Sequence, residues 1–417
     1  MFELLNDDQK KWVNLAEKLA VKFGERARES DEKAEFTFEN FEDLREHGFL
    51  KLPITEKYGG YGVDAGNHHL TAYLVTEVIS AKCPTTAWNL IIHFHQCGVV
   101  ARMGNEEICK RIFGDIIENG KIMGSLGSEV NPLQAIASKD TETKLTFKAG
   151  LTPVEGGFIA NGTKGFCSSG PVADYLLYWA LAPGTETNGE GLTICVVERD
   201  TPGVTFSSKG WNEIIGLRGT LSYNAEIKDV FIPWENIVGQ PGDFVQEDPY
   251  TYELSQSAHL LGIAQGALDF VLRVLRERPF LAKEDGLMGI VGEMGARVKA
   301  ARSFLWQGAE LFKHKHYSEA ALTSYQVLSF TKVTTMWVLD KAFETVGTRA
   351  LFKFNPLERL WREARVSSLH TRQTQINQLV AEGMVSEDFF PKHKYGVKVD
   401  ERKQWSELKL EYEKQLS

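Results

Sequence analysis

The order of hydrophobic patterns most constrains the fold of this 417-residue chain, because their spacing changes from helical to strand-like and back. Apolar residues recur at helical spacing over most of residues 1–120. From 121 to about 240 the apolar segments are short and separated by turn signals such as Asn161-Gly162 and Pro202-Gly203. Helical spacing returns after Pro241-Gly242. This order predicts an α+β fold, with an antiparallel β-barrel or sandwich held between two helical domains.

Four domains are expected from these changes. They are an N-terminal helical domain (1–120), a central β-domain (121–240), a C-terminal helix bundle (241–395) and a tail helix (396–417). Long helices are predicted over residues 254–278, 286–313, 319–346 and 357–382, a length typical of a bundle. Asn6 or Asp7 is placed to cap the first helix.

The composition is ordinary for a soluble globular protein. The formal net charge of -9 gives no electrostatic reason to bind nucleic acid or anionic lipid. The five cysteines are irregularly spaced without a CxxC, which is typical of reduced thiols in the cytoplasm. No basic leader precedes an apolar run at the N-terminus, and no uncharged apolar run approaches the ~20 residues that span a bilayer. We therefore expect a cytoplasmic protein with neither nucleic-acid nor membrane partners.

Several familiar motifs are absent or incomplete. Residues 58–62 (YGGYG) lack the GxGxxG order, and neither GxxxxGK[ST] nor GxSxG occurs. His93 and His95 would point to opposite sides of a helix, so they cannot share an ion. His93 and Cys97 could, but two ligands are too few for zinc, and no metal is predicted. His93 is thus either a polar residue at a domain interface or part of a pocket lining.

Three segments together resemble the acyl-CoA dehydrogenase superfamily along nearly the whole chain. They are residues 48–62 (GFLKLPITEKYGGYG), 161–175 (NGTKGFCSSGPVADY) and 211–233, which contains GLRGTLS and ends in VFIP. The resemblance implies the fold predicted above, a bound flavin and a homotetramer. Small hydroxyl residues suit this reading, because they let the chain approach a planar flavin ring and hydrogen-bond its polar edge.

The resemblance also implies which residues bind the flavin. The expected cofactor-binding residues are Ser125, Ser128, Phe166, Ser168, Ser169, Arg278, Phe280, Gly347 and Arg349. Two elements depart from the family pattern. No glycine follows Arg278-Pro279-Phe280, and Gly347-Thr348-Arg349 matches the second nucleotide-binding loop imperfectly. FAD and FMN therefore both remain open as the cofactor.

One position separates two kinds of flavin chemistry. Dehydrogenases of this superfamily need a carboxylate base, and Thr371 stands where the resemblance places it. Residues 357–365 (LERLWREAR) followed by His370 instead resemble the flavin-dependent monooxygenase branch of the superfamily. This branch includes dibenzothiophene monooxygenase and two-component phenol hydroxylases. An imidazole is suited to acid–base work near neutral pH. His370 is therefore the predicted catalytic residue, with His93, Tyr252 and Glu253 contacting the substrate.

The favoured function is a monooxygenase that uses reduced flavin and O2 on a small organic substrate. A separate flavin reductase would supply the reduced flavin, since no NAD(P)H fingerprint is present. One alternative is an FAD-dependent acyl-CoA dehydrogenase with Glu253 as its base. Another is a non-catalytic flavin-binding scaffold.

Overall fold

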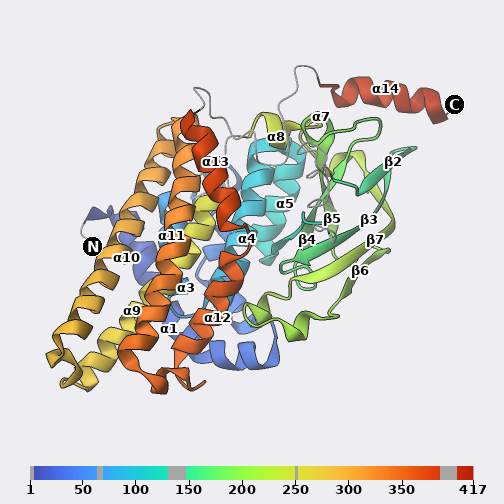
Figure 1. Cartoon of the computed structure of the whole chain (residues 1–417). Helices are drawn as coiled ribbons and strands as arrows, with labels where there is room; N and C mark the ends of the chain where they lie inside the picture. The colour runs from blue at the N-terminus through green and yellow to red at the C-terminus, as the bar shows by residue number, and fades with distance from the viewer. Residues whose placement is uncertain (1–3, 63–68, 130–146, 249–251, 386–401, 417) are drawn as a thin grey trace.

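The computed structural model describes residues 4–62, 69–129, 147–248, 252–385 and 402–416. Figure 1 shows the strands on one side of the molecule and the long helices of the C-terminal half on the other, with α4 and α5 between them. Helices precede and follow the strands along the chain, so the predicted fold class is confirmed. α4 connects the parts, because it packs on α3, α9 and strand β1.

The N-terminal part is helical. Its helices are α1 (Asp7–Lys33), α2 (Phe38–Glu46), α3 (Leu70–Ser80), α4 (Pro84–Met103) and α5 (Glu106–Asn119). Asn6 caps α1, because its side chain accepts from the Gln9 backbone N–H while the Gln9 side chain accepts from the Asn6 backbone N–H. Proline begins α4, where its missing N–H costs no helical hydrogen bond. Nearly every residue of α4 is buried, as expected for a helix that separates two domains.

The central part is one mixed sheet. Its strands are β1 (Met123–Leu126), β2 (Gly150–Val154), β3 (Gly157–Cys167), β4 (Tyr175–Leu181), β5 (Leu192–Glu198), β6 (Val204–Ser207), β7 (Tyr223–Pro233) and β8 (Ile237–Val238). The strand order is β6-β7-β3-β2-β4-β5-β8, and β1 pairs with β4. Most pairs are antiparallel, but β1 and β2 both run parallel to β4. The sequence also predicts a strand over residues 143–149, but residues 143–146 lie outside the described residues, and β2 begins after this segment.

The C-terminal part is a helix bundle. Its helices are α8 (Asp243–Gln246), α9 (Glu253–Glu277), α10 (Asp285–Lys313), α11 (Tyr317–Val346), α12 (Pro356–Ser368) and α13 (Gln373–Val385), after the short α7 (Asn188–Gly191) in the β-domain. α9 is long and apolar enough to cross a membrane, but 78% of its most apolar window is buried inside the protein. It is thus the core helix of the bundle, in contact with α3, α10, α11 and α12.

The single helix predicted over residues 357–382 is wrong. The chain forms two helices, α12 and α13, and residues 369–372 form a turn between them. No glycine or proline marks this break. Contacts from other helices hold the turn instead, since the Lys332 ammonium donates to the Thr371 carbonyl and the Gln256 amide donates to the Ser367 carbonyl. The break places His370 in a turn and not on a helix.

The tail helix α14 (Trp405–Leu416) lies against the β-domain (Figure 1). Trp405 packs on Phe158 and Trp234, with ring centroids 5.7 and 5.5 Å away. Arg402 forms ion pairs with Asp243 and Glu247. The tail therefore closes one edge of the β-domain core.

The Tyr412 hydroxyl fixes α14 by donating to the Pro183 carbonyl at 2.9 Å. Tyr412→Phe should lower the free energy of unfolding by about 1 kcal/mol, because it removes one net hydrogen bond and leaves the ring in place. Urea unfolding of both proteins measures this difference. A change below the error of that measurement would show that the bond does not stabilise the tail.

Candidate active site

Aromatic side chains from α4, from α9 and its N-terminal end, and from the turn after α12 meet in one place. Trp88 of α4 contacts the rings of Tyr252, His259 and His370, with centroids 6.1, 5.1 and 5.8 Å away. Tyr252 also lies 5.7 Å from His370 and 5.3 Å from His95. We call these five residues the aromatic cluster. Such mostly edge-to-face arrangements form a rigid surface of aromatic rings for a planar molecule.

Buried hydroxyl groups border the aromatic cluster on the side of the sheet. The Trp88 indole N–H donates to Ser168 Oγ at 3.2 Å. Ser168 Oγ lies 2.8 Å from Ser222 Oγ, which lies 2.8 Å from Thr220 Oγ1. The neighbouring Ser169 hydroxyl donates to the Asn89 side-chain oxygen at 3.0 Å. Polar atoms of two loops are thereby held next to the rings of α4.

Backbone strain concentrates in these two loops. Seven described residues other than glycine have positive φ, and four of them are Phe166, Ser169, Leu217 and Leu221. The register of β3 against β7 shifts between Lys164 and Cys167, and Phe166 within this bulge is 67% exposed. Bulges and strained residues of this kind often re-aim side chains at functional sites. An exposed ring beside buried hydroxyls is a suitable support for a flavin, so the residues present fit this cofactor.

His370 is the member of the aromatic cluster that lies in the turn after α12. The ring has accessible surface in the isolated chain. Desolvation by the surrounding protein nevertheless lowers the pKa of its imidazole, and the charge of Lys332 lowers it further. The imidazole is therefore neutral at neutral pH and able to accept a proton.

His259 contacts the start of this turn through one of its ring nitrogens. Its Nε2 lies 3.0 Å from the Pro84 carbonyl, which can only accept, so Nε2 carries the proton. Its Nδ1 then accepts from the Ser367 hydroxyl at 3.2 Å. Burial lowers the pKa of His259 to about 4, which keeps this tautomer neutral.

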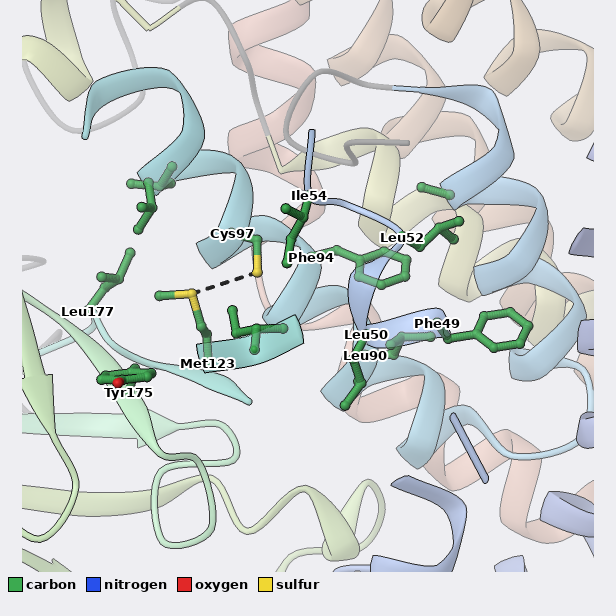
Figure 2. Close-up of a cluster of buried hydrophobic side chains, with 14 of the residues drawn as sticks. Phe49, Leu50, Leu52, Ile54, Leu90, Phe94, Cys97, Met123, Tyr175 and Leu177 are labelled. Carbon is green, nitrogen blue, oxygen red and sulfur yellow. Dashed lines mark hydrogen bonds between the residues drawn. The ribbon is translucent and has the colours of Figure 1, made fainter. Parts of the chain in front are cut away.

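Figure 2 shows where α4 meets β1. The Cys97 thiol and the Met123 sulfur, 3.7 Å apart, face each other there. His93 is fully buried in the same place, with Nε2 3.0 Å from the Leu50 carbonyl and Nδ1 accepting from the Met123 N–H at 3.1 Å. The predicted pocket-lining role does not agree with this position, because backbone groups occupy both ring nitrogens. His93 joins two domains instead.

Two buried histidines make stability depend on pH. Burial lowers the pKa of His93 to about 4, as it does for His259, whereas an unfolded histidine titrates near 6.5. Below that pH the unfolded chain takes up protons that the folded chain does not, so stability is lost as pH falls toward 4. Each histidine should cost about 2 kcal/mol between pH 7 and pH 5. Urea unfolding at pH 7 and pH 5 should show that His93→Asn loses about 2 kcal/mol less stability over this range than the wild-type protein. Equal losses in the two proteins would contradict the lowered pKa of His93.

Family models match the chain in three consecutive blocks. The N-terminal domain of acyl-CoA dehydrogenase matches residues 6–119, its middle domain residues 138–230 and its C-terminal domain residues 254–375. The chain belongs to the acyl-CoA dehydrogenase family. This membership confirms the predicted flavin-dependent oxidoreductase and flavin cofactor.

Several relatives align with almost the whole length of this chain. The short-chain specific acyl-CoA dehydrogenase of Clostridium acetobutylicum is 25% identical over 370 residues, which are 86% of this chain and 92% of the relative. Butyryl-CoA dehydrogenase of Megasphaera elsdenii has a TM-score of 0.81 at 21% identity, covering 93% of this chain and 100% of that one. FMN-bound TdsC of Paenibacillus sp. A11-2, a dibenzothiophene monooxygenase, has a TM-score of 0.79 at 22% identity, covering 91% and 98%. Dehydrogenases and a monooxygenase thus share the fold.

The other predicted flavin-binding residues lie in several separate elements of the chain. Ser125 Oγ of β1 accepts at 3.2 Å from the N–H of Gly127, which directly follows the strand. The Ser128 carbonyl accepts from the Gly165 N–H at 2.9 Å, which joins this exit to the β3 bulge. Ser168 and Ser169 border the aromatic cluster, as described above. In Figure 1 the β-domain and the α9–α10 connection are well separated, and that connection carries Arg278 and an exposed Phe280.

Gly347 and Arg349 follow α11 and are exposed. Tyr252 is part of the aromatic cluster, and Glu253 is the first residue of α9, half-buried beside it. Within the described part of the chain, no contact joins Arg278, Phe280, Gly347 or Arg349 to the aromatic cluster.

Sequence reasoning missed three residues around the site. Trp88 and His259 lie on strongly apolar helices, where they resemble ordinary core residues. Lys332 interrupts the apolar face of α11, and a lysine at a core position was the one available signal. Among the described residues, no group of three or more His, Cys, Asp or Glu side chains could hold a metal ion.

Proposed function

We propose that this protein is a flavin-dependent monooxygenase that uses reduced flavin and O2 on a small organic substrate. One observation carries the proposal: at the position before the one where the dehydrogenase pattern requires a carboxylate, the His370 imidazole contacts the rings of Trp88 and Tyr252. Thr371 follows it, and its hydroxyl cannot act as a base at neutral pH. The aromatic rings favour a planar substrate.

Each part of the site has a role in this proposal. Ser125, Ser168 and Ser169 would hold the polar edge of the flavin, and Phe166 would pack on its ring. A reduced flavin, when bound, supplies the two electrons that let one atom of O2 enter the substrate while the other leaves as water. Trp88 and Tyr252 would orient the substrate and exclude water. An imidazole nitrogen of His370 would accept the proton that the substrate gives up.

Other parts of the proposal concern partners and location. A separate reductase would deliver the reduced flavin, and the enzyme would act in the cytoplasm as a homotetramer. Exposed aromatic rings support assembly, since Phe352 and Phe354 stack at 5.5 Å and are 56% and 70% exposed. Arg278, Phe280, Gly347 and Arg349 would then reach the flavin of a neighbouring subunit. Either FAD or FMN could occupy such a site.

The second candidate is an acyl-CoA dehydrogenase with Glu253 as its base. Its support is the position of Glu253 beside Tyr252 at the start of α9, where a carboxylate lies next to the aromatic cluster. The two functions make opposite demands on oxygen. A dehydrogenase transfers hydride from the thioester to the flavin without O2, whereas a monooxygenase consumes O2.

The deciding experiment exposes the flavin-loaded protein to both kinds of substrate. Under an ¹⁸O2 atmosphere, with reduced FMN or FAD, indole should gain one labelled oxygen atom. Without oxygen, butyryl-CoA should leave the oxidised flavin spectrum unchanged. Anaerobic bleaching by butyryl-CoA that is lost in Glu253→Gln would contradict the proposal and establish the dehydrogenase. Neither reaction with bound flavin would indicate the scaffold.

A further inference from the structure

A buried lysine lies behind the turn that carries His370. Lys332 of α11 is only 4% exposed, and its ammonium donates to the backbone carbonyl of Thr371. Within the described part of the chain, no carboxylate lies within ion-pair distance of its Nζ. Burying an ammonium without an opposite charge is costly, so a lysine at such a place indicates a role beyond packing.

The charged surroundings of Lys332 connect it to His370. Burial, followed by the like charge of Arg365 on α12, lowers the pKa of Lys332 to about 8. It is therefore still mainly charged at neutral pH, and this charge opposes protonation of His370. Helices α9, α10 and α13 also pack on α11. Among the described residues, Arg365 and His370 are the titratable groups whose charges interact with Lys332.

Contacts from two helices hold the turn at both ends. At its start, Gln256 of α9 donates to the Ser367 carbonyl at 2.7 Å, and His259 bonds the Ser367 hydroxyl. At its end, Lys332 of α11 holds the Thr371 carbonyl. His370 lies between these anchors, so the position of its ring depends on both.

We propose that Lys332 is a positioning residue, which fixes the turn at residues 369–372 and keeps the His370 imidazole in its neutral, proton-accepting form. The role in catalysis rests on the proposed function of His370. The electrostatic effect on His370 does not, and it can be measured without substrate. A neutral replacement removes the charge, whereas arginine retains it.

The experiment compares Lys332→Met with Lys332→Arg in the full-length, flavin-loaded protein. NMR of ¹³Cε1-labelled histidine, with the His370 signal assigned by its loss in His370→Asn, gives the His370 pKa directly. It should rise by about one unit in Lys332→Met and stay near the wild-type value in Lys332→Arg. The acid limb of the pH–rate profile should move to higher pH by the same amount. Lys341→Met, which replaces a half-buried lysine of the same helix that pairs with Glu344, should change neither.

Two results would overturn the proposal. One is an unchanged His370 titration in Lys332→Met, and the other is a titration of Lys332→Arg that matches Lys332→Met. If Lys332→Met fails to fold, Lys332→Gln replaces it in the same comparison with Lys332→Arg. A shifted His370 titration together with no oxygenation of any substrate would leave Lys332 assigned and would count against the monooxygenase alone.

Discussion

Replacing His370 with asparagine should lower the rate of oxygenation by about 10²–10⁴-fold and leave the flavin affinity unchanged. Asparagine has a similar shape but cannot accept a proton at neutral pH. It keeps the turn because the backbone contacts at Ser367 and Thr371 do not involve the imidazole. Product formation from indole with reduced FMN, together with a fluorescence titration of the flavin, measures both effects.

His314→Asn is the matched control for this substitution. His314 is an exposed histidine at the end of α10, close enough to Glu310 for an ion pair when protonated, and it takes no part in the site. Its asparagine variant should oxygenate the substrate at the wild-type rate. A His370→Asn enzyme that also keeps the wild-type rate would remove His370 from the mechanism. Loss of flavin binding would instead assign it to the cofactor.

Arg302→Met should lower the free energy of unfolding by about 3–5 kcal/mol. Arg302 of α10 and Glu77 of α3 form an ion pair with both side chains buried, and Gln265 also accepts from the guanidinium at 2.7 Å. Burial raises the pKa of the Glu77 carboxyl, and the guanidinium offsets part of that effect. Without Arg302 the carboxyl lies buried and unpaired between the N-terminal helices and the bundle.

Urea unfolding tests this prediction with two comparisons. The double variant Glu77→Met/Arg302→Met should recover most of the loss, because it leaves no unpaired charge. Arg28→Met removes an exposed ion pair with Glu32 and should cost only about 0.3–0.5 kcal/mol. Equal effects of Arg28→Met and Arg302→Met would mean that burial of the pair does not matter.

The order of elements could be predicted because it depends on local patterns. Apolar spacing and caps are encoded within a few residues, as in the Asn6 cap of α1. The break between α12 and α13 could not be predicted in this way. It depends on Gln256 and Lys332, which are distant in sequence and reach carbonyls that would otherwise continue the helix.

The site was predictable in part for the same reason. Ser168 and Ser169 belong to a contiguous motif, so their segment could be identified without knowing the fold. The sequence leaves two roles open for His93, because its backbone partners at Leu50 and Met123 come from separate elements. Trp88 was missed because its role arises only where α4, α9 and the turn after α12 meet.

A structure of the protein with reduced or oxidised flavin bound would test the central claim most directly. The account predicts that the flavin ring packs between Phe166 and the aromatic cluster, with the His370 imidazole at its reactive edge, close enough to hydrogen-bond a substrate held there. A flavin bound elsewhere, or one whose reactive edge faces the Glu253 carboxylate while His370 points away, would contradict it.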